Sequence, residues 1–101
     1  MHKENLFVYG TLKDGDIRRA LFGGTPVGVE DALDGYAKSS TKISGIDYPN
    51  IAPADGDSVC GELLEVDGET LRRIDLYESE TYARRRFILR SGQRAWAYIR
   101  E

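Results

Sequence analysis

The chain has 101 residues, of which 41% are apolar and 31% are charged, and its formal net charge is −3. This length supports one hydrophobic core but not two, so we expect a single domain over residues 1–101 and no deep cleft between domains. The slightly acidic balance provides no general attraction to nucleic acid or to an anionic membrane.

Cys60 is the only cysteine, so neither an intramolecular disulfide nor a multi-cysteine metal site can form. The N-terminal residues contain no apolar signal segment, and no run of the sequence is long enough to span a bilayer. We therefore expect a soluble, cytoplasmic protein.

The first expected strand is the Leu-Phe-Val-Tyr segment at residues 6–9, which ends at Gly10. The loop after it can direct successive N–H groups toward a carboxylate or an oxyanion, and a plain tight turn is the alternative. A short helix capped by Asp14 or Asp16 is then expected to end at Gly23-Gly24.

The middle of the chain is expected to be mostly extended. A second strand is predicted within residues 26–36, with a break at Asp34-Gly35. Residues 37–45 show no periodicity and remain open between an irregular segment and a frayed strand. Residues 46–53 contain two prolines, which favour an extended surface segment.

A turn at residues 54–57 precedes a predicted central strand at 59–66, in which Gly61 can permit close approach of another backbone. Cys60 in this strand is expected to be a small buried hydrophobe rather than a nucleophile. The second helix is predicted at residues 71–77, capped by Asp67 or Thr70.

The chain ends with a predicted hairpin, in which residues 82–90 and 94–100 flank a turn at 91–93. The strands cluster in runs along the chain. This order predicts an α+β domain with a strongly curved, mostly antiparallel sheet.

Glu78 does not fit the polar surface of the second helix. On a helical wheel it points in the same direction as Leu71 and Ile74, so a helix that reaches it turns a carboxylate toward the core. Burial raises the pKa of a carboxyl group, which suits a general base. The alternative is that the helix ends one or two residues earlier and leaves Glu78 in a solvated turn. Asp75, at the edge of the apolar stripe, is a supporting candidate.

Other chemistries have less support from the sequence. The only histidine, His2, lies at the N-terminus, which disfavours Ser–His or Cys–His catalysis. The Asp-Gly-Asp motifs at 14–16 and 55–57 lack the further spaced acids of a calcium loop and are expected to be turns. Side chains of the arginine run 84–86 alternate between the two faces of a strand, so the run does not form one nucleic-acid patch. A partner surface that combines it with Arg72-Arg73 is a weaker alternative.

Short motifs follow one another along almost the whole chain: Val8-Tyr9-Gly10-Thr11-Leu12, Tyr48-Pro49-Asn50-Ile51, Ile74-Asp75-Leu76-Tyr77-Glu78 with Tyr82-Ala83-Arg84 after it, and Ala95-Trp96-Ala97-Tyr98. In this order and spacing the sequence resembles the gamma-glutamylcyclotransferase-like family of small AIG2-like proteins. The resemblance implies an α+β fold with a small curved, mostly antiparallel, β-barrel-like sheet, two flanking helices and a cavity at one end.

The resemblance also implies an enzyme, a gamma-glutamyl cyclotransferase that converts a γ-glutamyl-amine or γ-glutamyl-amino acid into 5-oxoproline and the free amine. Glu78 is implied as the general acid and base, and the loop that begins at Tyr9 as the part that binds the glutamyl end through its backbone. The implied substrate-binding residues are Tyr9, Gly10, Thr11, Leu12, Tyr48, Tyr82 and Arg84. No metal or organic cofactor is implied, and the expected partner is a small γ-glutamyl substrate rather than nucleic acid or membrane.

Two positions depart from the family pattern. Thr11 stands where serine is common, and Ser79 stands where glycine often follows the glutamate. The chain is also compact for the family, so the resemblance does not determine which amine or amino acid the substrate releases. A non-catalytic small-ligand-binding or regulatory module of the same fold is the alternative to an enzyme.

Overall fold

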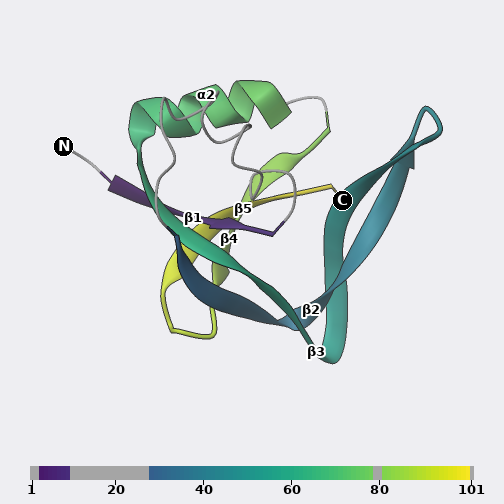
Figure 1. The fold of residues 1–101 in the computed structure, drawn as a ribbon, viewed down its shortest axis with the longest axis horizontal. Helices are drawn as coiled ribbons and strands as arrows, with labels where there is room; N and C mark the ends of the chain where they lie inside the picture. Colours follow the sequence, from purple (N-terminus) through teal and green to yellow (C-terminus); the bar gives the residue numbers. More distant parts are fainter. Residues whose placement is uncertain (1–2, 10–27, 79–80, 101) are drawn as a thin grey trace.

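A computed structural model describes residues 3–9, 28–78 and 81–100. These ranges contain one helix and five strands, namely β1 (Lys3–Val8), β2 (Val29–Ile43), β3 (Ile46–Asp67), α2 (Gly68–Glu78), β4 (Ala83–Ile88) and β5 (Arg94–Ile99). The strands form one sheet in the order β2-β3-β1-β5-β4. The sheet curls into a half-barrel, and α2 lies across one of its faces (Figure 1).

The sheet is mixed. β1 pairs with β5 in parallel, whereas the β1–β3, β2–β3 and β4–β5 pairs are antiparallel. The predicted first strand, central strand, second helix and C-terminal hairpin are confirmed. Of the two predicted flanking helices, α2 is observed, and the other falls within residues 10–27, outside the described part of the chain.

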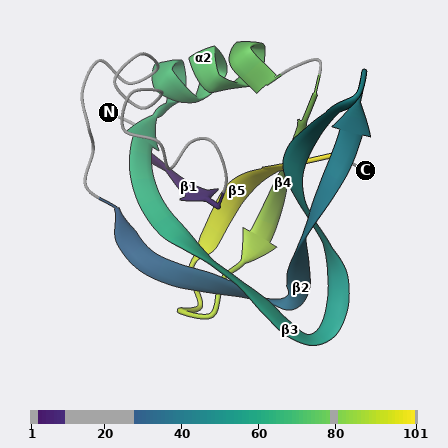
Figure 2. The same cartoon turned by 45° about the vertical axis from the view of Figure 1, so that its right-hand side comes forward.

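β2 is longer than the sequence predicts. It does not end at Asp34-Gly35 but continues to Ile43, and the chain then turns through Ser44 and Gly45 with φ of 51° and 81°. The register shifts between Asp34↔Ser58 and Tyr36↔Pro53, so the predicted turn at 54–57 is an irregularity inside β3. The outer halves of β2 and β3 bend away at this point and form a projecting arm (Figure 2).

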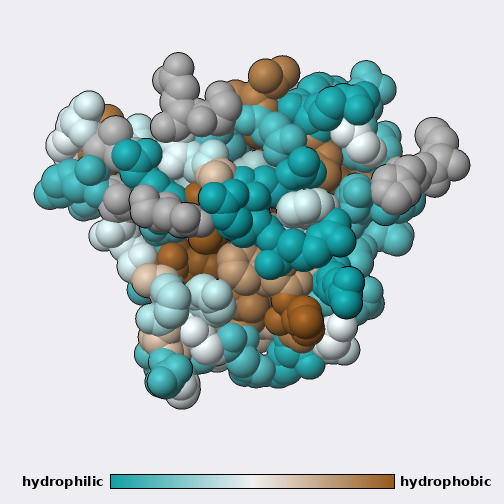
Figure 3. All heavy atoms as spheres, turned by 180° about the vertical axis from the view of Figure 1, so that it is seen from behind, coloured by the Kyte–Doolittle hydropathy of each residue, from teal (hydrophilic) through white to brown (hydrophobic). Residues whose placement is uncertain are grey.

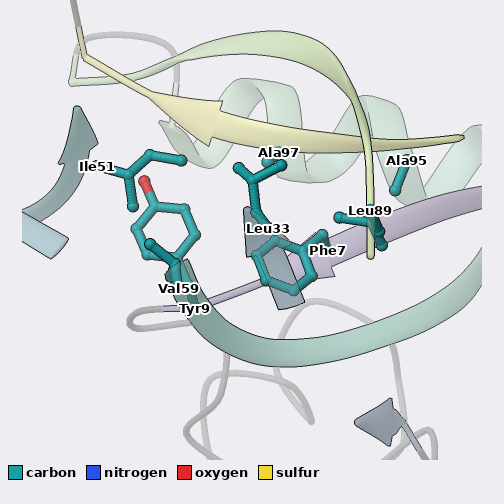
Figure 4. Close-up of a cluster of buried hydrophobic side chains, with 8 residues drawn as sticks. All are labelled: Phe7, Tyr9, Leu33, Ile51, Val59, Leu89, Ala95 and Ala97. Atoms are coloured by element: carbon teal, nitrogen blue, oxygen red, sulfur yellow. The ribbon is translucent and has the colours of Figure 1, made fainter. Parts of the chain in front are cut away.

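Two hydrophobic clusters hold the fold together, because the curled sheet buries apolar side chains on both faces. One cluster packs between α2 and the sheet and contains Leu6, Val8, Leu64, Val66, Leu71, Ile74 and Tyr98. The other fills the inside of the curl (Figure 4) and contains Phe7, Tyr9, Leu33, Ile51, Val59, Leu89, Ala95 and Ala97.

Gly61 allows β3 to lie against the end of β1, as the sequence predicts. A Cβ atom at this position would lie 2.4 Å from the carbonyl oxygen of Val8 and 2.7 Å from the ring of Phe7. The prediction for the neighbouring Cys60 is wrong, because its side chain is exposed. Alternation along β3 buries Val59 and therefore turns Cys60 to the other face.

The two edges of the sheet are brought together beyond the end of β4. The Arg90 N–H donates to the carbonyl of Ala32 over 2.8 Å, and the Ser91 hydroxyl donates to Asp31 over 2.5 Å. The Arg90 guanidinium also pairs with Asp34 at 2.7 Å. These contacts connect the β4–β5 turn to β2 and keep the sheet curled.

The surface seen from behind carries an apolar area in its middle, surrounded by hydrophilic side chains (Figure 3). Large apolar side chains that are exposed in the described ranges include Leu76 and Tyr77 on α2 and Ile46 near the tip of the arm. Within those ranges, no helix is long and apolar enough to cross a membrane.

Candidate active site

The end of α2 presents the first candidate residue, Glu78. The helix begins at a cap in which the Thr70 N–H donates to Asp67 Oδ1 over 2.7 Å. It ends at Glu78, whose carbonyl accepts the N–H groups of Thr81 and Tyr82 at 2.9 and 2.7 Å. The Glu78 residue is only 5% exposed, so the helix continues far enough to turn this side chain inward. The alternative of a solvated turn is wrong.

Burial changes the acid–base chemistry of Glu78. Removal of the carboxyl group from water disfavours its ionised form and raises its pKa from 4.5 to about 7. A carboxyl group that titrates near neutral pH can accept a proton in one step and donate it in the next. Glu78 therefore has the property that a general acid and base requires.

Three tyrosine hydroxyls lie within electrostatic range of this carboxyl group. Burial is the largest cause that raises the pKa values of Tyr9, Tyr82 and Tyr98, and the charge of Glu78 raises all three further. The pKa of Tyr82 rises to about 12. All three hydroxyls are therefore protonated and neutral at physiological pH. Among these four side chains, only the Glu78 carboxyl group titrates in that pH range.

Each of these hydroxyls donates its hydrogen to a protein acceptor. Tyr9 donates to the carbonyl of Tyr98, and Tyr82 donates to the carbonyl of Pro49. Tyr98 donates to Asp75 Oδ1 over 2.5 Å. These hydrogen bonds hold the three tyrosine side chains in place beside Glu78.

Hydrogen bonds hold the projecting arm next to Glu78 and these tyrosines. The Asn50 side chain pairs with the main chain of Arg100, with its Nδ2 donating over 2.6 Å and its Oδ1 accepting over 3.0 Å. The half-buried Tyr48 lies close enough to Tyr82 to raise the pKa of that residue. Tyr48 and Tyr82, predicted from distant parts of the sequence, are therefore brought together.

Arg84 lies on the face of the sheet that packs against α2. Its guanidinium is 3.4 Å from the Asp75 carboxylate. The guanidinium carbons of Arg84 and Arg86 lie 4.3 and 4.1 Å from the centroid of the Trp96 ring, an arrangement typical of cation–π contacts. Arg84 thus contacts α2 at Asp75, which lies three residues before Glu78.

The remaining predicted substrate-binding residues, Gly10, Thr11 and Leu12, lie outside the described residues. Tyr9, immediately before them, is 7% exposed and has its side chain in the inner cluster. Tyr9 is therefore the member of this predicted segment that the structure describes, and the charge of Glu78 raises its pKa.

Two residues with contacts at this site were not predicted from the sequence. Asn50 and Tyr98 belong to the motifs that carry the family resemblance, but neither was assigned a role. Asn50 and Arg100 are separated by 50 positions in the sequence, and Asp75 and Tyr98 by 23. Such separations leave no local signal of these contacts. The alternation of large side chains on β5, with Trp96 and Tyr98 on one face, is the pattern that could have indicated the second.

A separate cavity of about 510 Å³ opens beside the joined sheet edges and is lined by Glu30, Asp31, Ala32, Cys60, Gly61, Glu62, Arg90 and Ser91. None of these residues belongs to the predicted site. Within residues 3–9, 28–78 and 81–100, no group of three or more His, Cys, Asp or Glu side chains is arranged to hold a metal ion.

Residues 6–101 match the family described as gamma-glutamyl cyclotransferase, AIG2-like. AIG2-like protein A from Arabidopsis thaliana is 32% identical over 81 residues, which cover 79% of this chain and 48% of the relative. The chain thus spans about half the length of this curated relative.

Solved structures show the same fold. The solution structure of At5g39720.1 from Arabidopsis thaliana has a TM-score of 0.81 and 26% identity, and the match covers 98% of this chain and 69% of the other. A solved gamma-glutamyl cyclotransferase has a TM-score of 0.76 with 12% identity, over 99% of this chain and 68% of the other. At this low identity the second likeness concerns the fold alone.

Proposed function

Because the chain belongs to the gamma-glutamyl cyclotransferase, AIG2-like family, we propose that it is a γ-glutamyl cyclotransferase that uses Glu78 as general acid and base. The observation that carries this proposal is the inward, buried carboxyl group with a pKa of about 7. The proposed substrate is a γ-glutamyl-amine or a γ-glutamyl-amino acid, and the products are 5-oxoproline and the free amine.

The reaction requires one proton to be moved twice. The substrate's α-ammonium is not nucleophilic, so the Glu78 carboxylate first removes a proton from it. The free α-amine then attacks the γ-carbonyl carbon of the same molecule, and the C–N bond of the five-membered ring forms. Glu78 returns the proton to the departing nitrogen as the original γ-amide bond breaks. The ring nitrogen, which still carries a second proton after the attack, gives it up to the released amine or to water, so that the neutral lactam ring of 5-oxoproline forms.

The protein's other contribution is to hold the folded glutamyl group. Because the attack is intramolecular, correct placement of the amine and the carbonyl supplies much of the acceleration. We assign this placement to the backbone of residues 9–12, whose N–H groups would also stabilise the oxyanion that develops on the γ-carbonyl. Tyr48, Tyr82 and Arg84 are the further substrate-binding residues of the proposal.

Incubation with a panel of γ-glutamyl compounds tests this function. The panel contains a γ-glutamyl-amino acid, a γ-glutamyl dipeptide and a γ-glutamyl alkylamine, and 5-oxoproline is measured by mass spectrometry. An α-glutamyl dipeptide, in which the α-carboxyl forms the peptide bond, is the matched control. At least one γ-linked compound is expected to yield 5-oxoproline. If γ-linked compounds stabilise the protein against heat without yielding product, the binding-module alternative replaces the enzyme.

The pH dependence of kcat/KM is expected to report on Glu78. The carboxylate is the active form in the first step, so kcat/KM should rise about tenfold per pH unit below pH 7 and level off above it, as the group with a pKa of about 7 loses its proton. Initial rates at low substrate concentration between pH 5 and 8 provide the measurement. An acid limb centred near the ordinary glutamate value of 4.5 would contradict the assignment.

A further inference from the structure

The two halves of the proposed site come from opposite parts of the sequence. Glu78 is the last residue of α2, and Tyr9 follows the last residue of β1. The proposed reaction needs the Glu78 carboxyl group and the proposed substrate-binding residue Tyr9 at a fixed separation, because displacement of a reacting group by about 1 Å can lower the rate roughly a hundredfold. Some contact must therefore connect the end of α2 to the end of β1.

Tyr98 contacts both halves. Its side-chain hydroxyl donates to Asp75 Oδ1 over 2.5 Å and lies 3.5 Å from the carbonyl oxygen of Leu71. Its main-chain carbonyl accepts the hydroxyl hydrogen of Tyr9. Tyr98 is 6% exposed, so water competes little for either bond.

Asp75 completes the connection on the helix. It lies one turn before Glu78, and its second oxygen is 3.4 Å from the Arg84 guanidinium of β4. Arg84 in turn lies over the Trp96 ring. The last turn of α2 is thus tied to β5 through one carboxylate oxygen and to β4 through the other.

We propose that Tyr98 and Asp75 are positioning residues, which together fix the Glu78 carboxyl group relative to Tyr9 at the end of β1. This inference rests on the proposed role of Glu78. It assigns a function to Tyr98 and Asp75 that goes beyond packing, because their hydrogen bond sets where the carboxyl group lies.

The groups around Glu78 determine how its pKa responds if the last turn of α2 loosens. Within the described ranges, the titratable groups that face it are Tyr9 after β1, Tyr98 on β5 and Tyr82 between α2 and β4. Asp75 lies on its own helix and faces Arg84. If the turn moves outward, water reaches the Glu78 carboxyl group and its pKa returns toward the ordinary value.

Three variants separate positioning from general stability. Tyr98→Phe removes only the hydroxyl, and Asp75→Ala removes both carboxylate oxygens. Asp75→Asn keeps an acceptor oxygen for Tyr98 but replaces the oxygen that faces Arg84 with an amide nitrogen. We expect Tyr98→Phe and Asp75→Ala to lower kcat roughly tenfold to a hundredfold with little change in KM, and Asp75→Asn to lower kcat less than Asp75→Ala does. Carbon-13 NMR titration of the Glu78 carboxyl should show its pKa falling from about 7 toward 4.5 in the first two variants, and by less in the third.

Asp34→Ala is the matched control, because it removes a carboxylate–arginine pair of 2.7 Å to Arg90 that joins β2 to the β4–β5 turn and involves neither α2 nor Tyr98. It should change neither kcat nor the Glu78 pKa. The proposal is overturned if Tyr98→Phe and Asp75→Ala lower only the melting temperature and leave both quantities at wild-type values. The NMR titration decides this point even if the wild-type protein forms no 5-oxoproline, so failure of the proposed function is recognised separately.

Discussion

Glu78→Gln should abolish 5-oxoproline formation and, at pH 8, should make the folded protein more stable than the wild type. The amide cannot accept the α-ammonium proton or return it to the leaving nitrogen. Loss of a general acid and base lowers a rate by roughly a hundredfold to ten-thousandfold. Product formation at matched protein concentration, followed by mass spectrometry, measures this loss.

The gain in stability follows from the raised pKa of the buried carboxyl group. An acid whose pKa is higher in the folded state than in the unfolded state contributes full stability below the unfolded value of 4.5 and loses it as the pH rises to about 7. Above pH 7 the wild-type protein must hold an ionised carboxylate out of water, at a cost of roughly 1–3 kcal/mol. The neutral amide has no such cost.

Chemical unfolding at pH 8 and pH 4 measures this difference, which should be present at the higher pH and disappear at the lower one. Glu65→Gln, a change at an exposed position of β3, is the matched control and should alter neither activity nor stability. Full activity in Glu78→Gln would contradict the mechanism. An equal stability of wild type and variant at both pH values would contradict the buried, ionising carboxyl group.

Gly61→Ala replaces a single hydrogen with a methyl group, and we nevertheless expect it to destabilise the fold strongly. The new Cβ would lie 2.4 Å from the Val8 carbonyl oxygen and 2.7 Å from the Phe7 ring, so the backbone of β1 must move. Overpacking of this kind costs about 1–3 kcal/mol, and each kcal/mol corresponds to a fall of roughly 4–8 °C in melting temperature for a domain of this size. Thermal unfolding followed by circular dichroism checks the effect.

Activity should fall in Gly61→Ala as well, because Val8 immediately precedes Tyr9, which belongs to the proposed substrate-binding residues. Gly68→Ala is a suitable control, since a Cβ at the start of α2 meets no atom within 4 Å. It should be neutral or slightly stabilising, because alanine reduces the freedom of the unfolded chain. A wild-type melting temperature in Gly61→Ala would show that β1 and β3 do not approach as closely as described.

The parts of the fold with a repeating apolar pattern were predictable. The stripe of Leu71 and Ile74 indicated both α2 and the inward direction of Glu78, and the turn at 91–93 between two extended segments indicated the hairpin that contains β5. Burial of one face of an element gives the sequence a period that can be recognised without the structure.

The projecting arm was not predictable in the same way. Residues 38–40 and 44–47 are exposed, so this part of β2 and β3 buries too little side-chain surface to give an apolar alternation. It is held by main-chain pairing from Tyr36↔Pro53 to Ile43↔Ile46, which has no side-chain signature. The contacts of Tyr98 with Asp75 and of Asn50 with Arg100 were missed because tertiary contacts at such separations depend on the fold as a whole.

The place of β5 in the sheet has a consequence for synthesis of the protein. β5 is the last of the described strands to leave the ribosome, yet it lies between β1 and β4, and its pairing with β1 joins Leu6 to Trp96. Until β5 emerges, one edge of β1 remains unpaired and open to other chains. Contacts between such distant residues also slow folding, because a long loop must close before they form. The pairing of β1 can therefore be completed only after β5 has been made and released, which makes this part of the sheet the last to form.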